Sequence, residues 1–189
     1  MIGTAVTNID FGDAPDSYGT YIESNGARHG LDRDPGLFLG SGVDGESNSS
    51  AYPLTDDDND AIDDEDGIQF ATSVVDGTMA VVMVKSSGSG FLNGWIDFDS
   101  DGEFNGEDQV IYDYPITSER QSIYIEIPDG AVPGKTWSRF RLSSQTGLEP
   151  TGGAPDGEVE DYPVEIQEQD VTVNYYPCLL YTSPSPRDS

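Results

Sequence analysis

The sequence predicts an all-β protein: an antiparallel β-sandwich, Ig-like or jelly-roll-like, with a long irregular acidic segment at its N-terminal end. Three observations predict this class. Short apolar stretches, several in alternation with polar residues, recur from residue 67 onward, which is the pattern of strands. The chain of 189 residues contains 22 glycines and 12 prolines, a composition typical of strands joined by turns. No segment stands out as a helix, and a hydrophobic content of 35% suffices for a core.

Residues 1–66 show little periodicity. They contain turn-forming sequences at 12–15, 24–26 and 34–36, with glycine, proline, asparagine and aspartate in the combinations that favour turns. We therefore expect a mostly irregular segment with two short strands, ordered by packing and by bound cations.

The strands predicted beyond this segment follow from apolar periodicity. Residues 79–84 are apolar on both faces, which predicts a central strand. Ile123, Ile125 and Ile127 share one face of their segment, which predicts a half-buried strand, and Pro163 predicts an edge position for its own strand. In chain order, strands are expected at residues 79–84, 90–98, 109–116, 120–128, 136–143, 162–166 and, as the start of a further one, 171–175.

The segment 136–143 combines apolar and basic residues in alternation. Phe140 and Leu142 are expected to point inward, and Arg139 and Arg141 outward toward solvent.

We expect one domain over residues 9–177, preceded by a leader or linker fragment at 1–8 that lacks the pattern of a signal peptide. Residues 178–188 resemble the in-frame translation of a transposase sequencing adaptor, a contaminant of assembled metagenomic reads. We interpret residues 178–189 as an artefactual tail without ordered structure. Cys178, the only cysteine, lies in this tail, so no internal disulfide is predicted.

The charge of the chain excludes several classes of partner. Asp and Glu number 36 against 8 Lys and Arg, a formal net charge of -28. Nucleic acid and anionic membrane surfaces require a basic patch, which this sequence lacks. No apolar run is long enough to cross a bilayer. Bound divalent cations, high external salt or a strong core could offset the repulsion among these acids. The acids gather in four short segments, which favours bound cations.

The segment 97–108 is the most informative of these acidic segments. Its residues follow the spacing of an EF-hand calcium loop, with Asp108 at the twelfth position in place of the usual glutamate. Strands rather than helices are expected on both sides, so we predict a calcium loop in a β-context. The alternative interpretation is an acidic β-turn between two strands. The predicted ligands are Asp97, Asp99, Asp101, Glu103 through its backbone carbonyl, Asn105 and Asp108.

Three further acidic segments could hold additional ions and could converge in space. The segment 56–67 could equally be a solvated acidic loop. Glu158 and Glu160 share one face of an extended strand, where two like charges need a cation or water between them. The additional candidate ligands are Asp10, Asp13, Asp16, Asp63, Asp64, Asp66, Glu158, Glu160 and Asp161.

Catalytic groups are scarce in this sequence. His29 is the only histidine, and a lone histidine is more often structural than catalytic. A zinc site lacks suitable ligands. A pair of catalytic carboxylates, as in glycosidases, is neither supported nor excluded by a sequence with 36 acids.

Several motifs follow one another along the chain, at residues 10–20, 27–29, 39–40, 43–46, 63–67, 93–98, 139–143 and 157–162. Together and in this order they resemble the GEVED domain. The resemblance extends over residues 9–166 and implies an extracellular bacterial module within long multidomain secreted or surface proteins. It implies no catalytic activity.

These observations together predict a non-catalytic, calcium-binding module, located outside the cell or on its surface, that acts as a spacer or adhesion domain of a larger secreted bacterial protein. A second hypothesis is a module that binds a surface glycan or protein, with Trp95, Trp137 or the tyrosines as a platform; the alternative is that both tryptophans belong to the core. A carboxylate-dependent hydrolase is the remote third hypothesis.

Overall fold

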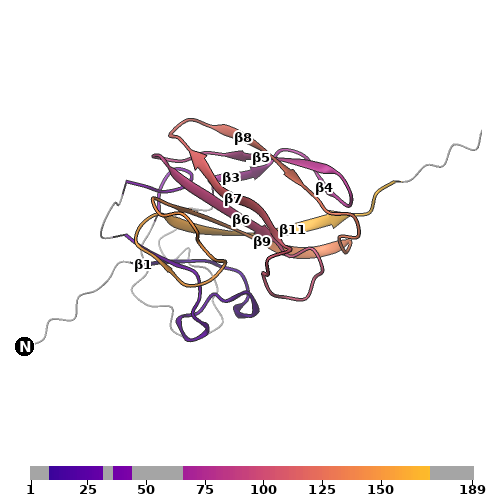
Figure 1. Cartoon of the computed structure of the whole chain (residues 1–189), viewed down its shortest axis with the longest axis horizontal. Helices are drawn as coiled ribbons and strands as arrows, with labels where there is room; N and C mark the ends of the chain where they lie inside the picture. Colours follow the sequence, from indigo (N-terminus) through magenta and orange to yellow (C-terminus); the bar gives the residue numbers. More distant parts are fainter. Residues whose placement is uncertain (1–8, 32–35, 44–65, 171–189) are drawn as a thin grey trace, which may run out of the picture.

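The structure is a computed structural model that describes residues 9–31, 36–43 and 66–170. Its strands form three sheets (Figure 1). The first has the order β1 (Ile9–Phe11), β2 (Arg28–Gly30), β10 (Gly153–Ala154). The second has the order β4 (Val74–Val75), β11 (Glu158–Gln167), β9 (Gly134–Ser143), β6 (Gly90–Ile96), β7 (Gln109–Ile116). The third has the order β3 (Ile68–Phe70), β5 (Met79–Val84), β8 (Gln121–Glu126).

The five-stranded sheet and the sheet β3–β5–β8 face each other across one apolar core (Figure 1). The predicted all-β sandwich is therefore confirmed. Alternation along the strands explains how the core is filled, because every second side chain of a strand faces the same way. In β8, Ile123 and Ile125 are buried between exposed neighbours, and Ile127 follows the same face just beyond the strand. The strand predicted as central, β5, lies between β3 and β8.

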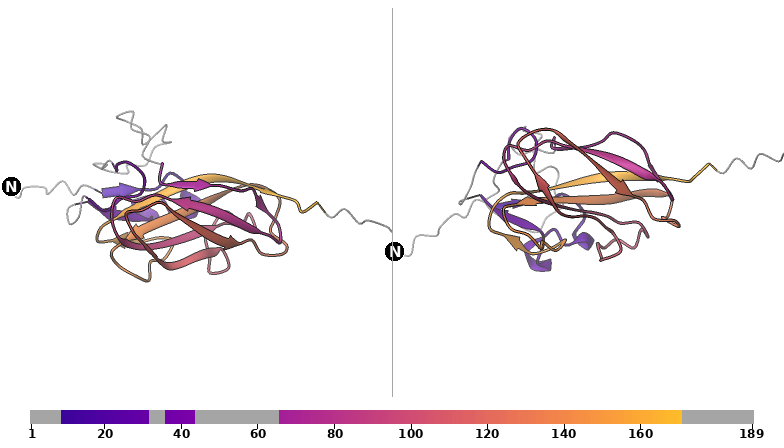
Figure 2. Two further views of the ribbon diagram at one scale, coloured as in Figure 1. Left: turned by 90° about the horizontal axis from the view of Figure 1, so that it is seen from above. Right: turned by 45° about the horizontal axis from the view of Figure 1, so that its top comes forward.

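In its described residues, 9–31 and 36–43, the N-terminal segment is largely irregular and contains the two short strands β1 and β2, in agreement with the prediction. Between β1 and β2 it also forms two 3-10 turns, η1 (Asp16–Tyr18) and η2 (Ile22–Ser24), which the sequence did not indicate. We call the sheet β1–β2–β10, together with η1 and η2, the N-terminal layer. This layer lies against the β9–β11 side of the sandwich (Figure 2). In the part of the chain that the structure describes, no helix is long enough to span a membrane.

The orientation predicted for Arg139 and Arg141 is wrong, because the N-terminal layer covers their side chains. Both side chains were expected in solvent, but they are 0% and 1% exposed. Phe140 and Leu142 face the core as expected. The opposite face of β9 is covered there by the N-terminal layer, so both faces of the strand are buried over residues 138–143 and alternation no longer separates core from solvent.

Two other predictions about single residues can be compared with the structure. Strand β11 pairs with β9 along its length, but with β4 only at Ile166 and Gln167. At Pro163, β11 therefore has β9 on one side and no contact with β4 on the other. This agrees with the predicted edge position. Trp95 is 1% exposed and belongs to the interior, whereas Trp137 is half-buried.

Some predictions fall on residues outside the described ranges. These are the leader fragment at 1–8, the acidic residues Asp63 and Asp64, the strand start at 171–175, and the tail at 178–189.

Candidate metal centre

The loop between β6 and β7 gathers three carboxylates. Asp97 follows β6 directly, and Asp108 precedes β7. Asp97 and Asp108 are buried and Asp99 is exposed, and one oxygen from each lies within 4.8 Å of the others. Calcium is bound at roughly 2.3–2.6 Å by such oxygens, so ligand atoms at this mutual separation can surround a single ion.

Hydrogen bonds within the loop fix its two buried carboxylates. Asp97 accepts hydrogen bonds from the amides of Asp101, at 3.3 Å, and Gly102, at 3.1 Å. Asp108 accepts from the amides of Phe98, at 3.0 Å, and Asn105, at 2.8 Å. These bonds fold the chain back around its own carboxylates, so amides of the loop backbone fix the positions of both side chains.

A tight turn in this loop depends on left-handed backbone. Gly102, with φ of 87°, and Ser100, with φ of 56°, both lie in this region. Glycine is the residue that adopts it without steric cost. The left-handed backbone of this turn therefore explains why glycine, Gly102, occupies the sixth position of the predicted calcium loop.

The Asp108 carboxyl carries an electrostatic cost in the folded loop, due mainly to its burial. Burial, followed by repulsion from Asp97 and Asp99, raises the pKa of the Asp108 carboxyl, although hydrogen bonds from Asn105 and Phe98 oppose this. A carboxylate that is costly to ionise in the folded state gains from a nearby cation. The loop therefore has an electrostatic reason to bind one.

The remaining predicted ligands of the loop are exposed. The Asp101 side chain accepts a hydrogen bond from the Glu103 amide, and the Asn105 side chain accepts one from the Glu107 amide. Asn105 lines the same hollow of about 190 Å³ as Asp99 and Asp108. The structure thus brings Asp97, Asp99 and Asp108 together, and it places Asn105 beside them.

A residue that the sequence did not indicate completes this site. The Tyr18 hydroxyl, from η1, donates a 2.7 Å hydrogen bond to Oδ2 of Asp97. Burial and this contact with Asp97 raise the pKa of Tyr18 to about 12, so the hydroxyl stays protonated and acts as a donor. Its sequence separation from Asp97 is 79 residues, and no local pattern predicts such a contact.

The predicted ligands in the N-terminal segment have separate roles. Asp10 is buried in β1 and accepts a hydrogen bond from the Val159 amide. Asp16 is exposed, and its pKa is lowered by hydrogen bonds from Ser24 and Tyr21. Asp13 is half-buried. Within the described ranges, these carboxylates do not form a further group with the close spacing of the loop.

The acidic residues of β11 connect distant segments to the sheet. Each accepts a hydrogen bond from a backbone amide far along the chain: Leu39 donates to Glu158, Gly67 to Glu160 and Ala14 to Asp161. Asp66, also a predicted ligand, accepts from the Ser41 amide and lies 3.6 Å from the Lys85 ammonium. These contacts give the acidic motif a structural role that does not require an ion.

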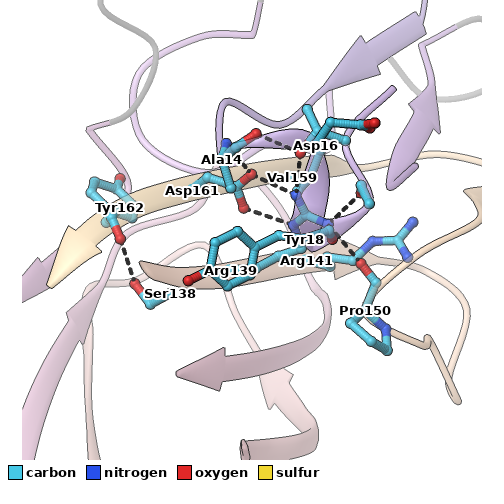
Figure 3. A network of polar contacts seen from close by, with 12 residues as sticks. Ala14, Asp16, Tyr18, Ser138, Arg139, Arg141, Pro150, Val159, Asp161 and Tyr162 are labelled. Carbon is cyan, nitrogen blue, oxygen red and sulfur yellow. Dashed lines mark hydrogen bonds and ion pairs between the residues drawn. The ribbon is translucent and has the colours of Figure 1, made fainter. Parts of the chain in front are cut away.

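Two buried arginines lie beneath the N-terminal layer (Figure 3). Arg139 forms a two-point ion pair with Asp161, with both N–O distances at 2.7 Å. It also donates to the carbonyls of Tyr18, Gly19 and Pro150. Such charge-assisted, two-point pairing is the strong form of the interaction, and it joins β9, β11 and the N-terminal layer.

His29 belongs to the same buried network. Its Nε2 accepts a hydrogen bond from Nε of Arg141, at 3.0 Å, and its Nδ1 donates to the Asp156 carbonyl, at 2.7 Å. Burial and the positive charge of Arg141 hold the pKa of His29 well below its usual value, so the ring is neutral. Both ring nitrogens are engaged in holding the layer, as expected for a structural histidine.

Fold and site together define an all-β module with a carboxylate-rich loop between two strands. The family model of the GEVED domain matches residues 91–165, from β6 to β11, including the loop and the acidic residues of β11. This match confirms the predicted resemblance over residues 91–165, and it associates these residues with a family of non-catalytic modules of larger bacterial proteins. Neither the search of curated proteins nor that of solved structures found a match.

Proposed function

We propose that this chain is a non-catalytic, calcium-binding extracellular module that serves as a spacer or adhesion domain in a larger secreted bacterial protein. The observation that carries the proposal is the group of Asp97, Asp99 and Asp108, whose oxygens lie within 4.8 Å of one another. Two of these carboxylates are buried, and burying like charges at this spacing is costly without a cation.

The chemistry of the loop favours calcium over other cations. All of its candidate ligands offer oxygen, the donor that Ca²⁺ and Mg²⁺ prefer. Calcium accepts irregular coordination by six to eight oxygens, whereas magnesium demands a near-ideal octahedron. The loop brings three carboxylates together, and Asn105 lines the same hollow. We propose the side chain of Asp101 and the carbonyl of Glu103 as further oxygen ligands.

Calorimetry of calcium binding tests the proposal. We expect the full chain to bind one ion at this loop, and Asp108→Asn to weaken binding at least about tenfold because it removes a charged ligand. Glu119→Gln is the matched control, since it removes one negative charge from an exposed position outside the loop. Equal affinities for both variants and the unmodified chain would show that calcium binds elsewhere or only diffusely.

A second candidate function is binding of a surface glycan or protein near the loop. Tyr112 on β7 is 64% exposed. It lines a hollow of about 300 Å³ that shares Phe98, Glu107 and Pro128 with the hollow at the calcium loop. An exposed aromatic side chain with a polar tip suits such recognition.

Binding of the chain to a panel of immobilised glycans, with calcium and with EDTA, tests this second function. We expect Tyr112→Ala to abolish any calcium-dependent signal. The exposed Tyr124 on β8 provides the control variant Tyr124→Ala. A panel without signal, or equal signals from both variants, would argue against a site at Tyr112.

A further inference from the structure

We infer that Tyr18 is a positioning residue of the calcium site, so that ion binding in the loop and docking of the N-terminal layer stabilise each other. The inference rests on the proposed function, because it concerns the same loop. It assigns to the site a residue that lies outside the acidic loop and outside the residues matched by the family model.

The first contact that carries the inference orients the buried ligand. Oδ2 of Asp97 is held from two sides, by the Tyr18 hydroxyl at 2.7 Å and by the Gly102 amide at 3.1 Å. Asp97 is fully buried, so water cannot replace a lost donor at low cost. The Tyr18 hydroxyl therefore fixes the orientation of this carboxylate within the group of three.

The second contact joins the loop to the layer through aromatic packing. The ring of Phe104, within the loop, lies 4.7 Å from the ring of Tyr18, measured between centroids. The guanidinium of Arg139 lies 5.4 Å from the centroid of the Phe104 ring. Arg139 also binds the backbone carbonyl of Tyr18, at 2.9 Å (Figure 3). One tyrosine thus contacts the loop and the buried arginine that holds the layer.

These contacts make calcium binding and docking of the N-terminal layer depend on each other. If the docked layer raises calcium affinity by a given factor, calcium must favour the docked layer by the same factor. An ion at Asp97 would restrain the loop against which Tyr18 packs, so the layer would open less often. We therefore expect calcium to protect amides of residues 14–27 from hydrogen exchange, although this segment supplies no ligand to the ion.

Tyr18→Phe tests the inference because it removes the hydroxyl and keeps the ring against Phe104. We expect calcium affinity, measured by calorimetry on the full chain, to fall about tenfold, as for loss of a hydrogen bond to a charged group. We also expect the calcium-dependent protection of residues 14–27, measured by hydrogen exchange, to shrink by a similar factor.

Tyr162→Phe is the matched control. It removes a tyrosine hydroxyl that also donates to a carboxylate, Glu160, at 3.0 Å, but away from the loop. We expect this control to leave calcium affinity unchanged. A general loss of packing would affect both variants, whereas a positioning role affects Tyr18→Phe alone.

The outcomes separate this inference from the proposed function. If the unmodified chain binds no calcium, the proposed function fails and the inference fails with it. If the unmodified chain binds calcium and Tyr18→Phe binds it equally well, only the inference is overturned. Calcium-dependent protection of residues 14–27 that is the same in both proteins would also overturn the inference.

Discussion

Replacing Arg139 with methionine is expected to lower the free energy of unfolding by about 3–5 kcal/mol, since it leaves a buried charge without its partner. Asp161 is fully buried beside Arg139. The substitution also removes the donor to the carbonyls of Tyr18, Gly19 and Pro150. Denaturant-induced unfolding measures the loss.

The exposed Arg120 provides the control for this prediction. Arg120→Met removes the same charge from the surface, where the expected change is below about 0.5 kcal/mol. The double variant Arg139→Met with Asp161→Leu should lose less than the sum of the two single variants, because each single change leaves the other group unpaired. A loss below about 1 kcal/mol for Arg139→Met would contradict the proposal that Arg139 holds β9, β11 and the N-terminal layer together.

Removal of calcium is expected to lower the melting temperature by about 8–16 °C. An ion that binds only the folded state, at about a thousandfold above its dissociation constant, adds roughly 4 kcal/mol. For a chain of this size, 1 kcal/mol corresponds to about 2–4 °C. Thermal unfolding of the full chain in millimolar calcium and in EDTA, at matched ionic strength, measures the difference.

Magnesium and a loop variant serve as controls for this melting experiment. Equimolar magnesium should reproduce little of the shift, because it tolerates irregular oxygen coordination poorly. Asp97→Asn should abolish most of the calcium response. A melting temperature that is the same in calcium and in EDTA would mean that no ion stabilises the loop and that hydrogen bonds alone hold its buried carboxylates.

The strands were predictable from sequence because their apolar periodicity is local information. The predicted segment 109–116 coincides with β7, and the isoleucines of β8 face the core as expected. The orientation of Arg139 and Arg141 was not predictable in this way. A basic residue opposite a core position normally faces solvent, and here the opposite face is covered by a segment more than a hundred residues away in sequence.

The site was predictable in part for the same reason. The spacing of Asp97, Asp99 and Asp108 lies within one loop, and the structure brings these three together. The contact between Tyr18 and Asp97 depends on how the N-terminal layer packs, so the sequence carried no signal for it.

The acidic residues of β11 show a different limit of sequence analysis. A carboxylate that binds an ion and one that accepts a backbone amide look identical in a sequence. Glu158, Glu160 and Asp161 were predicted as ligands, and the structure gives each of them a backbone donor from a distant segment. Only the tertiary arrangement identifies these partners.

The most direct test of the central claim is an anomalous difference map from crystals of this chain grown in millimolar calcium. The account predicts one strong peak bounded by the carboxylates of Asp97, Asp99 and Asp108, with oxygens at roughly 2.3–2.6 Å. The same map should show Oδ2 of Asp97 in contact with the Tyr18 hydroxyl. A loop without a peak, in crystals that diffract well enough to show ordered water there, would contradict the account.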